Sequence, residues 1–177
     1  MKKIALTVMA CSLFINTLLA QRYLADTFTA VDSVVNIAYG SAPNYQHKTQ
    51  TLHLDFYEPK GDKASKRPLI IYVHGGGFTE GTRKWASVKL MCEKLAMKGY
   101  AVASIDYRLD PTANVFVTDT NRRPITDAMH DLKAAIRFFK ANQSKYRIDT
   151  ANIVTGGESA GAVTAMTAAY VDKISEL

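Results

Sequence analysis

The sequence predicts an α/β fold, with a mostly parallel sheet and flanking helices, in one domain over residues 21–177. Two observations lead to this prediction. Short apolar runs, typical of strands covered on both faces, alternate along the chain with stretches whose apolar residues recur at helical spacing. The length of 177 residues and the apolar content of 47% suit a single domain with a sizeable core. Alternating strands and helices imply right-handed crossovers between parallel strands.

The first part of the chain predicts three strands. Val31–Tyr39 and Thr51–Tyr57 are interpreted as strands, and the second alternates apolar and polar residues, as expected when one face of a strand is buried. Pro59–Asp62 marks a turn. Leu69–Val73 is a continuous apolar run, which suits a strand covered on both faces. It leads directly into the glycine-rich segment His74–Phe78.

The second part of the chain predicts alternating helices and strands. Gly99 is placed to end one helix, and Pro124 to begin another, since proline is favoured in a first helical turn. Residues 114–123 have no clear period and are predicted to form a loop that borders a substrate site. The predicted elements, in order, are a helix over 84–98, a strand over 100–105, an amphipathic helix over 124–139, a short strand over 153–155 and a buried helix over 160–171.

Residues 1–20 have the layout of a secretory signal peptide. Lys2 and Lys3 precede a largely apolar run that ends in the small residue Ala20, before Gln21. The run is shorter than the roughly 20 apolar residues that a membrane span requires, and polar residues interrupt it. We therefore expect a secreted or periplasmic protein with no stable membrane span.

Lipid attachment at Cys11 is the alternative role for this segment. Val8–Cys11 resembles a lipoprotein cleavage box, but the apolar run continues well past it, which favours the secretory signal. Removal of the signal would leave Cys92 as the single cysteine, and a single cysteine forms no intramolecular disulfide. Stability is therefore expected to come from packing.

The composition argues against several other classes of protein. The net charge is +6, but the basic residues are scattered rather than massed, so no nucleic-acid partner is predicted. The histidines are also scattered and Cys92 has no spaced partner, so we expect no metal site and no cofactor. The charged fraction of 21% is near the globular average and argues against disorder. The sequence gives no indication of the oligomeric state.

The segment Gly157–Gly161 matches the G-x-S-x-G pattern of a nucleophilic serine on a sharp turn between a strand and a helix. Residues two positions before and after the serine must lack side chains that would collide in such a strained turn. Ser159 then projects its hydroxyl at a helix N-terminus, where unpaired N–H groups favour negative charge. The bare pattern arises by chance in about 5% of chains of this length, but here it lies between a predicted strand and a predicted helix.

A second glycine-rich segment follows an earlier buried strand. The three successive glycines Gly75–Gly77 let backbone N–H groups approach a substrate oxygen without interference from a Cβ atom. Such a loop also suits a phosphate group. No Gly-Lys-Ser or Gly-Lys-Thr follows it, which argues against a nucleotide site.

Over roughly residues 51–171 the sequence resembles the α/β-hydrolase esterases, in particular the hormone-sensitive-lipase-like, type-B carboxylesterase and feruloyl-esterase-like groups. Glu158 is closer to the type-B carboxylesterases, whereas aspartate is common at this position in the hormone-sensitive-lipase-like group, so the subgroup stays open. Four motifs in the family's order carry the resemblance: Leu54–Pro59, the His-Gly-Gly-Gly-Phe loop at 74–78, Ile105–Leu109 and the Gly-Glu-Ser-Ala-Gly turn at 157–161.

The resemblance implies an α/β-hydrolase fold with Ser159 as the catalytic nucleophile. It implies further roles for two groups of residues. The oxyanion hole would be formed by the backbone N–H groups of Gly76, Gly77 and Ala160, and the oxyanion loop would be shaped by His74 and Gly75.

The base and the acid that such a serine requires are missing from the sequence. The family's chain order is serine, then Asp or Glu, then histidine. Asp172 and Glu176 follow Ser159 without any histidine, and both are interpreted as solvated charges at a helix end. Asp106 and Asp131 are interpreted as structural, with Asp131 paired to Arg108 or Lys133. The histidines all precede Ser159 and are given structural or surface roles: His47, His53, His74 and His130.

The family's sheet continues with further parallel strands after the nucleophile helix, and these are absent here. We therefore expect the N-terminal portion of a longer esterase, with the nucleophile strand at an exposed sheet edge prone to aggregation. The leading hypothesis is a serine carboxylic-ester hydrolase that acts through an acyl-enzyme on a small-molecule or carbohydrate ester, present as a fragment without the triad acid and histidine. The alternative is an inactive truncated protein that acts as a binding module or has no function.

Overall fold

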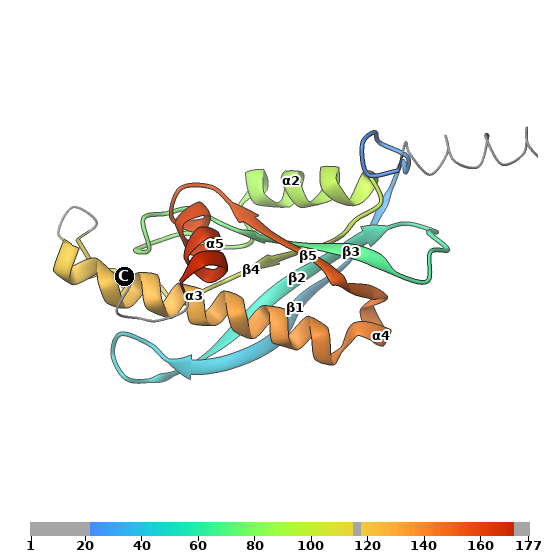
Figure 1. Ribbon diagram of the computed structural model, residues 1–177. Coiled ribbons are helices and arrows are strands. Elements are labelled where there is room, and N and C mark those ends of the chain that lie inside the picture. The colour runs from blue at the N-terminus through green and yellow to red at the C-terminus, as the bar shows by residue number, and fades with distance from the viewer. Residues whose placement is uncertain (1–21, 115–117, 172–177) are drawn as a thin grey trace, which may run out of the picture.

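The computed structural model describes residues 22–114 and 118–171, shown in Figure 1. The predicted signal peptide, Cys11, Asp172 and Glu176 lie outside the described residues. Within the described ranges, no helix combines the length and the apolar content needed to cross a lipid bilayer.

Five strands form one mixed sheet in the order β1-β2-β4-β3-β5. Antiparallel pairing joins β1 to β2 and β2 to β4, whereas β3 is parallel to both β4 and β5. It follows that β2 alone runs against the other strands, in agreement with the predicted, mostly parallel sheet. The strands are β1 (Val31–Pro43), β2 (Thr49–Pro59), β3 (Arg67–Val73), β4 (Ala101–Ile105) and β5 (Ile148–Gly157).

Helices cover both faces of this sheet (Figure 1). α2 (Ala86–Met97) packs on β2 and β4, while α3 (Thr118–Ala141) and α5 (Ala160–Tyr170) pack on each other and on β5. α4 (Gln143–Tyr146) is a short turn before β5. The strand–helix order after β2 places both glycine-rich segments at the carboxyl ends of neighbouring parallel strands, because β3 ends at Val73 and β5 ends at Gly157.

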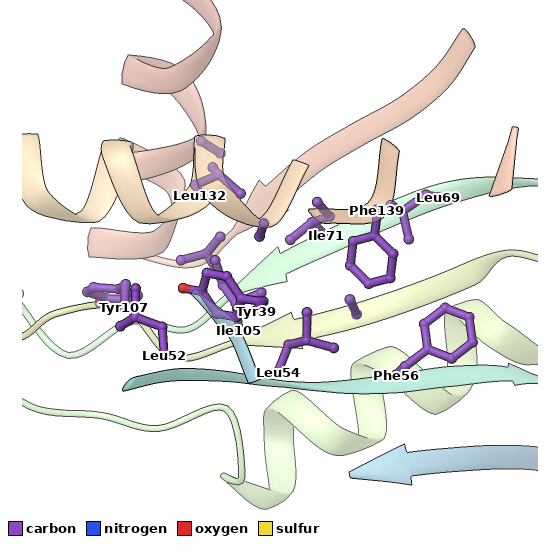
Figure 2. Packing of buried hydrophobic residues seen from close by; sticks show 14 of the residues in the cluster. Tyr39, Leu52, Leu54, Phe56, Leu69, Ile71, Ile105, Tyr107, Leu132 and Phe139 are labelled. Atoms are coloured by element: carbon purple, nitrogen blue, oxygen red, sulfur yellow. The ribbon is translucent and has the colours of Figure 1, made fainter. Parts of the chain in front are cut away.

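The two faces of the sheet build two separate clusters of buried residues. Side chains alternate between the faces of a strand, so Ala101, Ala103 and Ile105 of β4 join the larger cluster while Val102 joins the smaller one under α2. Figure 2 shows the larger cluster, where residues of β2 and β3 meet those of α3. Labelled members there include Leu54, Phe56, Leu69, Ile71, Leu132 and Phe139.

The structure corrects one sequence prediction around Pro124. Residues 114–123 were expected to form a loop before a helix starting at Pro124, but α3 already begins at Thr118 and Pro124 lies inside it. Proline removes one helical hydrogen bond, yet its φ near −65° is itself helical, so the helix continues through this position. Residues 115–117 of the expected loop lie outside the described part of the chain.

β5 is longer than the predicted strand over 153–155. It begins at Ile148, which pairs with Arg67, and its pairing with β3 contains a register irregularity between Arg67 and Leu69. The polar residues between Ile148 and Ile153 face solvent wholly or in part, so they do not show the apolar run of a buried strand. This strand was therefore recognisable from the sequence only at its apolar end.

The outer side of β5 is an edge of the described sheet, as predicted. β5 stands last in the strand order, and Val154 on it is 53% exposed. The helix beside it, α5, also exposes apolar side chains, those of Val163, Met166 and Tyr170. Apolar surface next to an unpaired strand edge favours association with another polypeptide.

Candidate active site

Ser159 lies in the turn between β5 and α5. Its backbone has φ 50° and ψ −121°, a combination that residues other than glycine rarely adopt. The turn is closed by the N–H of Gly161, which donates to the carbonyl of Glu158 at 2.8 Å. The strained strand–turn–helix geometry expected from the sequence pattern is therefore present at this serine.

The glycines on either side of Ser159 are required by close backbone contacts. A Cβ atom on Gly157 would lie 2.2 Å from the carbonyl oxygen of Val73, and one on Gly161 would lie 2.1 Å from the same atom. Backbone atoms cannot move aside as a flexible side chain can. The turn is therefore held against the end of β3 by contacts that only glycine permits at both positions.

Ser159 opens into a cavity of about 630 Å³ at the carboxyl ends of β3 and β5. This volume lies within the range of small-molecule sites. The segment 114–123 was expected to border a substrate site, and its first residue, Asn114, lines this cavity. The cavity is lined by Gly76, Gly77, Thr79, Glu80, Ala113, Asn114 and Ser159.

The glycine loop after β3 lies directly beside the serine turn. A Cβ atom on Gly75 would be 3.4 Å from the Cβ of Ser159. The carbonyl of Gly76 accepts hydrogen bonds from the N–H groups of Thr79 and Glu80, each at 3.0 Å, which folds the loop back on itself. The structure thus brings Gly76 and Gly77 to the same cavity as Ser159.

Three backbone N–H groups near Ser159 make no hydrogen bond to a backbone carbonyl of the described residues: those of Gly76, Gly77 and Ala160. Ala160 is the first residue of α5, where N–H groups lack an intrahelical partner and the helix dipole favours negative charge. Donors of this kind can stabilise an oxygen that becomes negatively charged during a reaction.

His74 belongs to the framework of the glycine loop. Its ring is 1% exposed, stacks on Tyr107 at a centroid distance of 4.5 Å and places Nδ1 2.7 Å from the carbonyl of Gly75. Because a carbonyl only accepts, Nδ1 carries the proton of this hydrogen bond. Burial lowers the pKa of the imidazole below its ordinary value, which keeps it neutral. The Tyr107 hydroxyl donates to the His74 carbonyl at 3.1 Å.

The other sequence candidates for acid–base roles lie away from the cavity lining. His47 and His130 are exposed and His53 is partly exposed. Asp131 pairs with Arg108, whose Nη2 lies 2.8 Å from its Oδ1, so one of the two predicted partners is confirmed. Among the described residues, no group of three or more His, Cys, Asp or Glu side chains is arranged to hold a metal ion.

Sequence reasoning missed the partner of Asp106. Asp106 was interpreted as structural, and its carboxylate accepts from the buried guanidinium of Arg83, which also binds Asp55. Arg83 has no regular spacing to either carboxylate, so a periodic pattern could not reveal the contact. The available signal was the position of Asp106 directly after a buried strand, inside one of the motifs shared with esterases.

The BD-FAE family model matches residues 54–177, which is most of the chain. The chain belongs to the BD-FAE family of α/β-hydrolase esterases. The structural neighbours agree. This BD-FAE chain superimposes on Thermogutta terrifontis esterase 2 phosphorylated by paraoxon with a TM-score of 0.61 and 26% identity, over 76% of this chain and 46% of that one.

Curated relatives of the BD-FAE chain include two esterases from eukaryotes. It is 31% identical to gut esterase 1 of Caenorhabditis elegans over 64% of its own length and 20% of that protein. It is also 31% identical to the probable isoprenylcysteine alpha-carbonyl methylesterase of Oryza sativa subsp. japonica, over 72% of its own length and 25% of that protein. The chain thus spans about a quarter or less of these curated relatives.

Proposed function

We propose that this chain carries the nucleophile and the oxyanion donors of a serine carboxylic-ester hydrolase. The observation that carries the proposal is the position of Ser159, on a positive-φ turn that opens into the same cavity as Gly76 and Gly77. The membership in an esterase family gives the reaction class. Together these features fit attack of a serine hydroxyl on an ester carbonyl.

The proposed reaction passes through an acyl-enzyme. The Oγ of Ser159 forms a bond to the carbonyl carbon and its proton goes to a general base. The carbonyl oxygen becomes negatively charged and accepts hydrogen bonds from the N–H groups of Gly76, Gly77 and Ala160. The bond to the alcohol oxygen then breaks, and the alcohol takes the proton from the base. Water next attacks the acyl group and releases the acid with Ser159 restored.

The general base and its orienting acid are proposed to belong to further polypeptide of a longer esterase. The described residues that line the cavity include no histidine. The chain covers 46% of the Thermogutta esterase and smaller shares of the curated relatives, which supports this reading of the chain as an N-terminal portion.

The substrate is proposed to be a small-molecule or carbohydrate ester. The polar side chains of Thr79, Glu80 and Asn114 line the cavity beside Ser159 and suit an alcohol group that carries hydroxyls. Export by the signal segment would bring the enzyme to carbohydrate polymers outside the cell, which carry such esters. N-terminal sequencing of the protein secreted by its host tests the export proposal, with a start at Gln21 as the expected result.

The second candidate is a non-catalytic module that binds through the same cavity. The absence of a histidine after Ser159 favours it as a description of these 177 residues taken alone. Hydrolysis of p-nitrophenyl acetate by the chain and by Ser159→Ala tests this candidate. A faster rate for the chain than for Ser159→Ala would show that these residues alone hydrolyse the ester, and equal rates would contradict that activity of the chain alone.

The same assay with the protein purified from its host tests for a longer enzyme. An intact mass above that of the 177-residue chain, together with rapid labelling of Ser159 by a fluorophosphonate, is the expected result. A host protein whose mass exceeds that of the 177-residue chain but whose Ser159 is not labelled would contradict the proposed nucleophile.

A further inference from the structure

An ion cluster is centred on Arg83, where Arg83 and Asp55 are buried while the Asp106 side chain is 29% exposed. Arg83 is 3% exposed, and its guanidinium reaches three side chains. Nε donates to Asp55 at 2.9 Å and Nη2 donates to the side-chain oxygen of Asn36 at 2.9 Å, while Nη1 donates to Asp106. Buried charges are tolerated in proteins only when they are paired and hydrogen-bonded in this way.

Asp106 binds the backbone at Arg83 as well as its side chain. Its Oδ1 accepts from the Arg83 N–H at 2.8 Å and from the Thr82 hydroxyl at 3.3 Å. The position of Asp106 is itself set by the sheet, since its own N–H donates to the carbonyl of His53 at 2.9 Å. The segment that ends at Arg83 is therefore fastened to the end of β4.

The start of the same loop is held by Tyr107, the residue that follows Asp106 after the end of β4. Tyr107 donates its hydroxyl to the carbonyl of His74 and stacks on the His74 ring. Two consecutive residues, Asp106 and Tyr107, thus hold the two ends of the segment 74–83. A loop with both ends fixed to one rigid strand has few conformations available to its central glycines.

The end of the loop also packs directly on its beginning. A Cβ atom on Gly81 would lie 2.5 Å from both the carbonyl oxygen of Gly75 and the Nδ1 of His74. A shift of the backbone at Thr82 and Arg83 is therefore transmitted through Gly81 to the peptide that precedes Gly76. The ion cluster at Arg83 is thus linked, through the contact of Gly81 with Gly75, to the peptide that carries the Gly76 N–H.

From these contacts we infer that Arg83 and Asp106 are positioning residues for the oxyanion hole, acting through the loop 74–83 to aim the N–H groups of Gly76 and Gly77 beside Ser159. The inference rests on the proposed function for its effect on catalysis. Donors to the oxyanion act in the transition state more than on the bound substrate. Loss of the pair should therefore lower kcat while leaving KM nearly unchanged.

Amide hydrogen exchange tests the loop itself without requiring catalysis. Asp106→Asn keeps the side-chain shape but removes its charge, Arg83→Gln removes the cation, and Arg83→Lys keeps the cation without its fork of donors. Exchange in the peptide covering residues 74–83 should accelerate at least about tenfold in Asp106→Asn and Arg83→Gln, and less in Arg83→Lys, because each lost contact weakens the fastening by about 1.4 kcal/mol or more.

Trp85 provides a second readout of the loop. It is the single tryptophan of the sequence and contacts His74 edge to face, at a centroid distance of 5.9 Å. Its emission should shift in the Arg83 and Asp106 variants. Arg67→Gln is the matched control, because Arg67 is 0% exposed and pairs with Glu58 at the opposite, amino end of β3. The control should lower thermal stability without changing loop exchange or Trp85 emission.

Steady-state kinetics of the enzyme purified from its host completes the test. The expected result is a fall in kcat of about 10- to 100-fold in Asp106→Asn, below the 10²–10³-fold loss on removal of a whole oxyanion donor. Unchanged loop exchange and Trp85 emission in both Asp106→Asn and Arg83→Lys, or a kcat equal to that of Arg67→Gln, would overturn the inference. If the host enzyme has no Ser159-dependent activity, the proposed function fails while the exchange test still decides the role of the pair in the loop.

Discussion

The serine turn and the glycine loop meet at one cavity, but they are held in place by different physical means. The turn at 157–161 is held by backbone contacts, with two glycines pressed against the carbonyl of Val73. The loop at 74–83 is held by the side chains of Asp106 and Tyr107, the two residues that follow the end of β4. The turn therefore depends on two residues that have no side chain, both within its own short segment. The loop depends instead on side chains that are distant from it in the sequence.

The largest effect is expected from a methyl group at the serine turn. In Gly161→Ala the new Cβ would overlap the Val73 carbonyl oxygen at 2.1 Å, so the turn must move away from β3. We expect a loss of about 3 kcal/mol or more in the free energy of unfolding. Urea titration followed by circular dichroism measures it.

Gly156→Ala is the control for this substitution. Gly156 precedes the turn, and a Cβ atom there would have nothing within 4 Å. Its unfolding free energy should stay within about 0.5 kcal/mol of the original. Equal losses in the two variants would show that the turn does not depend on the contact with Val73.

A smaller effect is expected when one fastening of the loop is removed. Tyr107→Phe keeps the stacked ring but deletes the hydroxyl that donates to the His74 carbonyl. The buried carbonyl then loses a donor, and stability should fall by about 1 kcal/mol. Thermal unfolding measures the change, with Tyr170→Phe, whose ring is 84% exposed, as the control. A Tyr107→Phe protein as stable as its control would contradict the role of this hydrogen bond.

Acid should weaken the ion pairs that Glu58 makes with Arg67 and Arg147, at the amino end of β3 and away from the glycine loop. Burial acts to raise the pKa of Glu58, but hydrogen bonds from Arg67 and Arg147 outweigh it, so the pKa lies below its ordinary value of 4.5. A carboxyl with a lowered folded-state pKa stabilises the protein above 4.5, and this contribution is lost as the pH falls through the folded-state value.

Thermal unfolding at a series of pH values measures this contribution. The difference in midpoint between the original protein and Glu58→Gln should be constant above about pH 5 and shrink below it. The effect should be smaller than that of Tyr107→Phe, because the Glu58 side chain is 31% exposed. A difference that grows on acidification would contradict the lowered pKa.

The smallest effect on stability is expected on the exposed face of α5, the helix that follows the serine turn. Met166 on α5, a helix that packs on the edge strand β5, is 61% exposed, so Met166→Lys should change the unfolding free energy by less than about 0.5 kcal/mol. It should instead reduce self-association, since charge next to an exposed edge opposes pairing. Light scattering at increasing protein concentration measures this. Equal scattering by both proteins would contradict the predicted association.

The sequence predicts the serine turn well because its determinants are local. Gly157, Ser159 and Gly161 lie within one short segment, and the need for small residues there follows from the turn alone. The strands over 51–57 and 69–73 were likewise found from their own periodicity, and the structure extends each by a few residues. The helix start at Pro124 was wrong, because a proline fits both a first turn and a helix interior that tolerates one missing hydrogen bond.

The amino-acid sequence by itself determined the α/β class, the esterase family motifs and the residue at the centre of the candidate site, Ser159. Only the tertiary structure decided how the glycine loop is held, with Arg83 bound to Asp55 and Asp106 and with Tyr107 on His74. The reason is physical. A turn depends on the steric limits of neighbouring residues, whereas a buried ion pair depends on strand order and register, which bring β2 and β4 together beneath the loop.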